Sequence, residues 1–178
     1  MFDINQIQTG DGLLVSSHSF LARQIQKFQK IQDEQGGKWN HAAVSWWAYD
    51  ELMVIEADTR GIAITPFRDY LNSNRSLMRL IPQFYIDGSE CGKFMLPYAG
   101  HTRYDKWNLI VAQAVKFLTF GKVWLGERKE NDKKFICGEW AHFVWKQFRP
   151  DLFPEFSPKI APVDLFLNKN FSHQIIKP

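Results

Sequence analysis

Short apolar runs bounded by turn-forming residues predict a small β-sheet in the first half of the chain. The runs are rich in aliphatic and aromatic residues and are separated by Gly, Pro, Asn and Asp, which is typical of strands. The second and third runs form a hairpin in this interpretation, because only residues 48–51 separate them. The predicted strands are 13–15, 42–47, 52–57, 61–65 and 77–81.

Apolar residues at helical spacing predict helices between and after these strands. Residues 86–103 contain several glycines and a proline and are expected to form a loop or flap. Closely spaced prolines predict an irregular C-terminal extension over residues 150–178. The pattern therefore indicates a single α+β domain over residues 1–178. The predicted helices are 20–31, 67–71, 107–118 and 137–148.

Composition is ordinary for a soluble globular domain. Of the 178 residues, 45% are apolar and 23% are charged, which argues against global disorder. The net charge of +3 is too small to indicate nucleic-acid binding. No apolar run reaches the roughly 18 residues that cross a bilayer, and the N-terminus lacks a secretory signal. We therefore expect a cytoplasmic protein, or a virion-associated one if it is of phage origin, without nucleic-acid partners.

The candidate metal and cofactor motifs are weak. Cys91 and Cys137 are too few for a zinc cage or a disulfide framework of their own. A site that combines His41, Cys137 and either Cys91 or His101 matches no ligand spacing typical of zinc. The glycines at 10–12 are too short a motif for a phosphate loop and lack the required lysine. We expect no metal, no cofactor and two free thiols.

Cys137 begins the last predicted helix. There a thiol meets backbone N–H groups without intrahelical partners and the positive end of the helix dipole. Both features lower the pKa of a thiol and favour the nucleophilic thiolate. The alternative is a small buried residue, because Cys137 also shares the apolar stripe of Trp140, Ala141 and Val144.

A nucleophilic thiol needs a base, and His41 is the strongest candidate. It begins the first strand of the predicted hairpin, where its ring can be held in one orientation. A histidine at a strand end can instead have a structural role. The other histidines lie in a helix start, a loop, the Cys137 helix and the C-terminal region: His18, His101, His142 and His173.

Glu56 is the candidate third member of the site. If the hairpin turn centres on residues 49–50, Ala43 faces Glu56. His41 and Glu56 are then diagonal neighbours on one sheet face, with Cα atoms about 7–8 Å apart. A carboxylate with apolar neighbours needs a partner, and hydrogen bonding to one imidazole nitrogen would supply it and fix the tautomer. Asp58 lies on the same face and is the competing candidate.

Four short motifs follow one another along the chain: Gly-Asp at 10–11, Asn-His-Ala-Ala-Val at 40–44, Val-Ile-Glu-Ala at 54–57 and Ile-Cys-Gly-Glu at 136–139. Their order resembles the circularly permuted branch of the NlpC-type papain-like cysteine hydrolases, in which the His strand precedes the Cys helix. Lecithin:retinol acyltransferase-like proteins belong to the same wider group. Residues 161–165 resemble the C-terminal extension of that family. The family commonly has Ser-His-Val-Gly and Cys-Ser-Glu, so the chain departs beside the histidine and the cysteine but not at them.

The resemblance implies a permuted papain-like fold, with a small antiparallel sheet or barrel packed against helices that carry the cysteine. It also implies a peptidase or amidase with a Cys137–His41–Glu56 triad. The thiolate attacks a carbonyl to form a thioester, and the imidazole moves the proton. Peptides, amides and acyl esters are substrates for this chemistry. Two other interpretations stay open: an acyltransferase that uses the same residues, and a non-catalytic binding or structural module that retains the fold.

Overall fold

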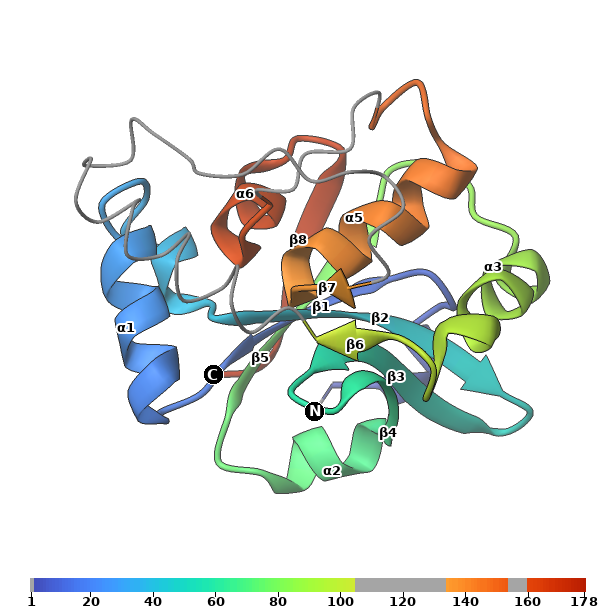
Figure 1. Ribbon diagram of the computed structural model, residues 1–178, viewed down its shortest axis with the longest axis horizontal. Helices are drawn as coiled ribbons and strands as arrows, with labels where there is room; N and C mark the ends of the chain where they lie inside the picture. Colours follow the sequence, from blue (N-terminus) through green and yellow to red (C-terminus); the bar gives the residue numbers. More distant parts are fainter. Residues whose placement is uncertain (1, 105–133, 154–159) are drawn as a thin grey trace.

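The computed structural model describes residues 2–104, 134–153 and 160–178. They form an α+β fold built on an antiparallel sheet of six strands in the order β4-β3-β2-β1-β5-β8 (Figure 1). The sheet is open, because β4 and β8 at its two edges do not pair with each other. The strands are β1 (Gly12–Ser16), β2 (His41–Ala48), β3 (Glu51–Asp58), β4 (Gly61–Pro66), β5 (Ser76–Pro82) and β8 (Phe171–Lys177).

Helices cover both faces of the sheet, with α5 across one face and α2 against the other (Figure 1). A second, two-stranded parallel sheet of β6 (Arg103–Tyr104) and β7 (Lys134–Phe135) contacts β4. No helix in the described part of the chain has the length and apolar character needed to cross a membrane. The helices are α1 (Phe20–Gln29), α2 (Phe67–Asn72), α3 (Gly88–Met95), α5 (Cys137–Phe148) and α6 (Pro162–Leu167), with 3₁₀ turns η1 (Ile4–Gln6), η2 (Gly36–Lys38) and η3 (Leu96–Tyr98).

Successive residues of the central strands point to opposite faces of the sheet and build two cores. Leu14 of β1 and Ile55 of β3 belong to the larger core, which α5 covers. Their neighbours Val15 and Val54 belong to the smaller core, which α2 covers. Because both faces are covered, these strands read as continuous apolar runs in the sequence instead of alternating with polar residues.

Two tryptophans fix α5 on the sheet. Trp140 and Trp145 are fully buried, and each indole N–H donates a hydrogen bond to a backbone carbonyl of the sheet region. Trp140 donates to Ile55 at 3.1 Å, and Trp145 donates to Gly10 at 2.9 Å. The two bonds satisfy buried indole N–H groups, which would destabilise the fold if they had no acceptor. They also fix the helix start, where Cys137 lies.

All five predicted strands are present, and the register predicted for the hairpin is confirmed. Ala43 of β2 faces Glu56 of β3, and a two-residue turn at 49–50 joins the strands. Tyr49 takes a positive φ of 57° in this turn. The predicted helices at the start of the chain, after β4 and at Cys137 are also confirmed. The helix predicted over 107–118 lies outside the described residues.

The prediction of a loop or flap over residues 86–103 is wrong, because α3 and η3 occupy most of this stretch. Asp87 caps α3 by accepting hydrogen bonds from two backbone N–H groups of its first turn, at 2.9 and 3.1 Å. The glycines that suggested a loop include one with a packing role. A Cβ at Gly92 would lie 2.5 Å from the indole nitrogen of Trp46, so only glycine allows the ring to approach the helix.

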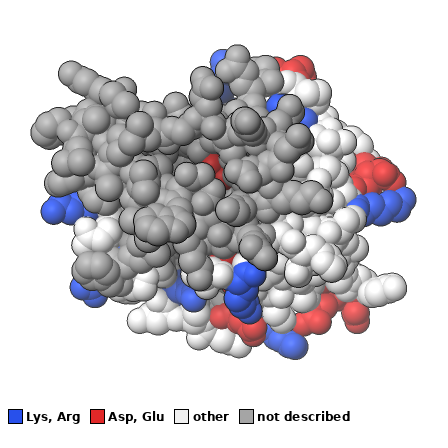
Figure 2. Space-filling model, in the orientation of Figure 1, with Lys and Arg blue, Asp and Glu red and all other residues white. Residues whose placement is uncertain are grey.

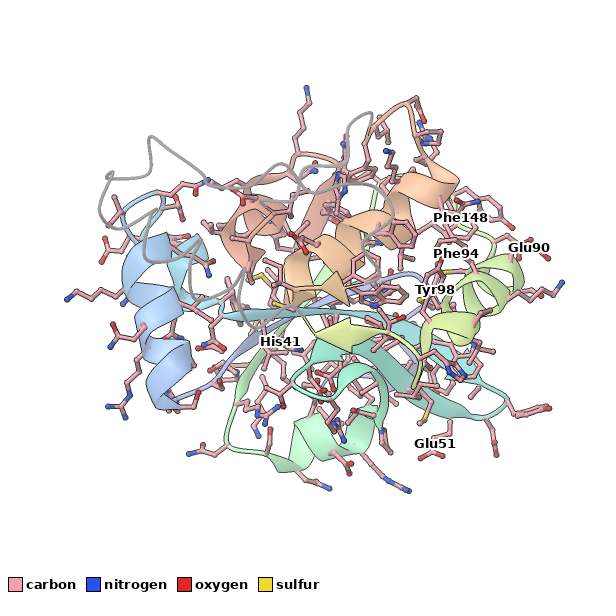
Figure 3. The ribbon with its side chains drawn as sticks, viewed as in Figure 1. His41, Glu51, Glu90, Phe94, Tyr98 and Phe148 are labelled. Atoms are coloured by element: carbon pink, nitrogen blue, oxygen red, sulfur yellow. The ribbon has the colours of Figure 1, made fainter. Side chains whose placement is uncertain are left out.

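Aromatic side chains join α3 to α5. The ring centroid of Phe94 lies 5.6 Å from that of Tyr98 and 6.1 Å from that of Phe148, and the three rings gather between the two helices (Figure 3). Such edge and tilted pairs add to the free energy gained by burying the rings. The segment is therefore a packed part of the core.

Residues 150–178 are not an irregular extension where the structure describes them. α6 begins at Pro162, whose fixed φ suits the first turn of a helix. β8 pairs with β5 along the edge of the main sheet. An edge strand with mostly exposed or half-buried residues has no continuous apolar run, and among its residues only Phe171 is fully buried. That is why the strand was not predicted.

A buried ion pair ties three strands together. Arg79 of β5 places Nε and Nη2 each 2.6 Å from Oδ2 of Asp11, just before β1, and both side chains are under one-tenth exposed. Arg79 also donates to the Gln174 side chain of β8 at 3.2 Å, and the Gln8 N–H donates to Asp11 at 2.7 Å. Burial raises the pKa of Asp11, although the Gln8 N–H and the Arg79 charge oppose the rise.

Removing one partner of this pair should be strongly destabilising. Arg79→Leu is expected to lower the free energy of unfolding by about 3–5 kcal/mol, because Asp11 is then buried without its cation. The double variant Asp11→Asn/Arg79→Leu should recover much of this loss, since it removes both charges while the asparagine still accepts from Gln8. Chemical denaturation of wild type, the single variants Arg79→Leu and Asp11→Asn, and the double variant measures the effect. A double variant as unstable as the sum of the two single losses would contradict this interpretation.

Candidate active site

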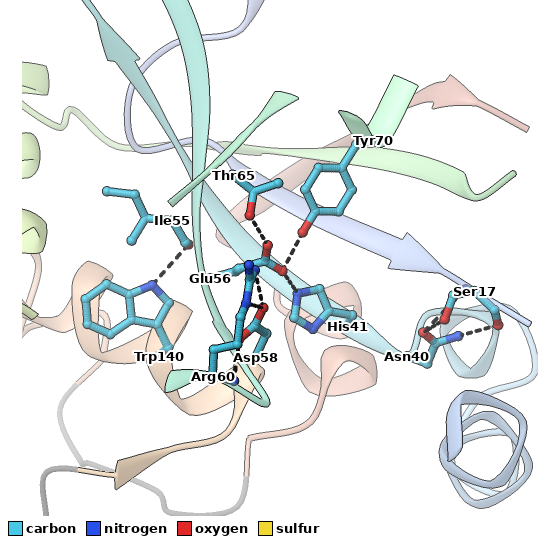
Figure 4. Close-up of polar contacts among 10 residues, drawn as sticks. All are labelled: Ser17, Asn40, His41, Ile55, Glu56, Asp58, Arg60, Thr65, Tyr70 and Trp140. Atoms are coloured by element: carbon cyan, nitrogen blue, oxygen red, sulfur yellow. Dashed lines mark hydrogen bonds and ion pairs between the residues drawn. The ribbon is translucent and has the colours of Figure 1, made fainter. Parts of the chain in front are cut away.

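His41 lies at the first position of β2, opposite Val15 of β1. Its Nε2 atom is 2.6 Å from Oε2 of Glu56 on the neighbouring strand β3 (Figure 4). The contact follows from the register of the hairpin, which makes the two residues diagonal neighbours on one face. The His41 side chain is 20% exposed, while that of Glu56 is only 7% exposed. The imidazole therefore lies between the buried carboxylate and an accessible space.

Glu56 accepts hydrogen bonds from three elements of the fold (Figure 4). Besides His41, the Thr65 hydroxyl of β4 donates to Oε1 at 2.7 Å. The Tyr70 hydroxyl of α2 donates to Oε2. Asp58, the competing carboxylate, instead pairs with Arg60, whose Nε lies 2.7 Å from its Oδ2. Of the two candidates, Glu56 is the one that contacts the imidazole.

The surroundings shift the pKa values of both groups. Burial alone raises the pKa of Glu56, but the hydrogen bond and charge of His41, with help from Tyr70 and Thr65, lower it from its ordinary 4.5 to about 2. Burial lowers the pKa of His41, but the nearby Cys137 and then Glu56 raise it from 6.5 to about 10. Near neutral pH the carboxylate is therefore negative and the imidazole positive.

Cys137 is the first residue of α5. Its thiol lies close enough to His41 to raise the pKa of the imidazole. The two residues line the same cavity of about 360 Å³. Since Nε2 of His41 is taken by Glu56, Nδ1 is the ring nitrogen left for the thiol. The first turn of α5 is stabilised by Glu139, which accepts the Ile136 N–H at 3.0 Å. The structure thus brings together Cys137, His41 and Glu56, the three residues predicted from the sequence.

Glycine follows the cysteine because the chain leaves no room for a side chain. A Cβ at Gly138 would collide with the carbonyl oxygen of Ile160, in the segment that leads into α6. The serine that the resembling family commonly has at this position could not be accommodated without a backbone shift. Glycine at position 138 is therefore explained by the close approach of the Ile160 carbonyl.

The cavity wall carries both positively and negatively charged side chains. Arg60 and Asp58 form an ion pair there, and Arg75 lies 5.5 Å from the centroid of the Tyr70 ring. The described charged side chains on the face in Figure 2 are also of mixed sign. Hydroxyl and amide groups complete this part of the wall: Ser17, Ser19, Asn40, Thr59, Thr65 and Ser73.

The remaining histidines lie elsewhere. His142 is buried on α5, and burial together with Lys146 lowers its pKa to about 4. His173 stacks on Phe166 with a centroid distance of 4.6 Å. His18 and His101 are exposed and are absent from the described lining of the cavity.

Two residues of the site were not predicted from the sequence. Thr65 could have been found by extending the register argument to the next hairpin, because Val54 faces Thr65 and Glu56 is its diagonal neighbour. Tyr70 could not, since it reaches Glu56 from a helix that packs on the sheet. No local pattern encodes that contact.

No family model and no curated protein matches the chain. Among solved structures, one protein has a fold similar to the α+β fold of this chain, which is built on a six-stranded open antiparallel sheet and helices. That protein is the metalloprotein YiiX from Escherichia coli O157:H7, assigned to DUF1105. The match has a TM-score of 0.57 at 14% identity and covers 97% of this chain and 98% of YiiX. At this identity the similarity establishes the fold alone.

Any side chain at position 138 is expected to disturb the start of α5. Gly138→Ala should lower the free energy of unfolding by about 1–3 kcal/mol or more, because the Ile160 carbonyl must move. Gly88→Ala is the matched control, since it also lies in a first helical turn but its nearest neighbour would be 3.1 Å away. Thermal or chemical denaturation compares the two. Equal losses in both variants would contradict the steric explanation.

Glu56 should make the protein sensitive to acid. Its folded pKa is depressed, so its contribution to stability is present above the ordinary 4.5 and is lost as the pH falls toward about 2. The shift corresponds to about 3 kcal/mol. Glu56→Gln should therefore lose less stability than wild type between about pH 5 and pH 2. Unfolding measured at several pH values tests this, with the exposed Glu51→Gln as control. Parallel curves for wild type and Glu56→Gln would contradict it.

Proposed function

We propose that this protein is a thiol-dependent hydrolase that cleaves peptide or amide bonds through a Cys137–His41–Glu56 triad. The observation that carries the proposal is the cavity in which Cys137, at a helix N-terminus, neighbours an imidazole bound to a buried carboxylate. This is the arrangement of nucleophile, base and orienting group that acyl transfer requires. It supports membership of the permuted NlpC-type papain-like group, which the order of the sequence motifs also indicates.

The proposed reaction has two halves. The Cys137 thiolate attacks the substrate carbonyl carbon and forms a tetrahedral oxyanion, near the backbone N–H groups at the start of α5. As the oxyanion collapses, the bond to the leaving amine breaks, and His41 gives that amine its proton. Water then attacks the thioester carbon while His41 accepts a proton from it, and the carbon–sulfur bond breaks. The acid product leaves, with the Cys137 thiolate and the protonated imidazole restored. Glu56 holds the imidazole in the required tautomer throughout.

YiiX is described as a metalloprotein, so the fit of these residues to a metal ion matters. Within the described residues, no group of three or more His, Cys, Asp or Glu could hold one. Both oxygens of Glu56 already accept hydrogen bonds from protonated donors. The described residues do not fit a metal ion, and no step of the proposed reaction passes through one.

Thiol alkylation tests the proposal without knowledge of the substrate. Iodoacetamide at neutral pH should modify Cys137 much faster than Cys91, which is fully buried and whose pKa burial raises to about 12. His41→Ala should slow modification of Cys137 by about 10²-fold or more, in line with the loss of a catalytic base. The exposed His101→Ala serves as control and should react like wild type. Peptide mapping by mass spectrometry gives the rate at each thiol.

The outcomes separate the function classes. Equal, slow labelling of both thiols would contradict the hydrolase and favour a non-catalytic module. Where Cys137 is selectively labelled, a panel of peptide, amide and acyl-ester substrates is then tested with and without an added amine acceptor. Release of the free acid in water supports the hydrolase. Transfer of the acyl group to the amine with no hydrolysis would instead identify an acyltransferase.

A further inference from the structure

The buried carboxylate of Glu56 has more hydrogen-bond donors than a histidine partner alone would give it. Tyr70 donates to the same oxygen, Oε2, that His41 contacts, and Thr65 donates to Oε1 at 2.7 Å. Tyr70 is only 2% exposed, so water does not compete for its hydroxyl. Glu56 is therefore held from a strand on one side, a strand on the other and a helix (Figure 4).

These donors favour the charged form of the carboxyl. Hydrogen bonds to an ionised group are shorter and stronger than those between neutral groups, and they stabilise the ion that accepts them. Tyr70 keeps its proton for this purpose, because burial and the Glu56 charge raise the pKa of its phenol. The Tyr70 and Thr65 hydroxyls thus stabilise the negative charge of Glu56 and carry no charge themselves, so that His41 is its cationic partner.

We propose that Tyr70, assisted by Thr65, is a positioning residue that holds Glu56 ionised and in fixed orientation, so that Nδ1 of His41 stays directed toward Cys137. The inference rests on the proposed function and deepens it, because it assigns the support of the triad to α2 and β4. Tyr70 acts through Glu56 and His41 and does not itself touch the reacting atoms.

Other charged side chains line the cavity near Glu56. Arg60 and Asp58, on the turn between β3 and β4, pair with each other. Arg75 lies over the Tyr70 ring, and Asp69 of α2 lines the same cavity. None of these residues is replaced in the variants tested below, so a difference in the Glu56 titration between wild type and variant reports the lost hydroxyl.

Tyr70 also fills space in the smaller core, and a merely structural role must be distinguished from positioning. Tyr70→Phe keeps the ring and removes only the hydroxyl. The titration of Glu56, followed by the ¹³C signal of its carboxyl carbon, should then shift upward by about one pH unit, a tenfold rise in proton affinity. Alkylation of Cys137 at neutral pH should slow about threefold or more. The half-buried Tyr98→Phe is the control and should change neither quantity.

Thr65 gives a second, independent pair of variants. Thr65→Val removes the hydroxyl and should shift the Glu56 titration in the same direction, whereas Thr65→Ser retains it and should match wild type. A Glu56 midpoint unchanged in both Tyr70→Phe and Thr65→Val overturns the inference, and so does unchanged alkylation of Cys137. A wild-type Cys137 that reacts no faster than Cys91 overturns the hydrolase instead, whatever the Glu56 titration shows.

Discussion

The candidate site is organised around one buried carboxylate, which requires hydrogen-bond donors. Glu56 is almost inaccessible to water, and an unpaired charge there would cost several kcal/mol. Its partners come from β2, β4 and α2, so the elements that solvate the charge are also those that pack around it. The same contacts that make the carboxylate tolerable direct the imidazole. Stability and the proposed chemistry are therefore coupled at this residue.

The second constraint is the position of α5. The cysteine can meet the histidine only if the helix start is fixed relative to the sheet, and the indole hydrogen bonds of Trp140 and Trp145 fix it. These are two of the seven tryptophans in the chain, and both are fully buried in the core. The packed aromatic cluster between α3 and α5 also contacts the helix, and its Tyr98 ring lies 5.5 Å from that of Trp140. The site thus depends on large, rigid side chains that do not themselves line the cavity.

Strands β1 to β5, the hairpin register and the His41–Glu56 contact could be predicted from the sequence, because each depends on local periodicity or on the geometry of a short turn. α3 could not, since its glycines suggest a loop until the ring that packs against Gly92 is known. β8 could not either, because an edge strand buries too little to show an apolar run. The contact of Tyr70 with Glu56 could not be predicted either, because it forms only when α2 packs against the sheet.

The steric contact at Gly138 has a consequence for how the protein is made. The Ile160 carbonyl abuts the helix start that carries the cysteine, and β8 follows α6 to close the edge of the sheet. Both follow Cys137 in the sequence. Because synthesis proceeds from the N-terminus, the cysteine is made before the residues that pack against its helix start, and a chain interrupted before residue 160 carries the thiol without that contact.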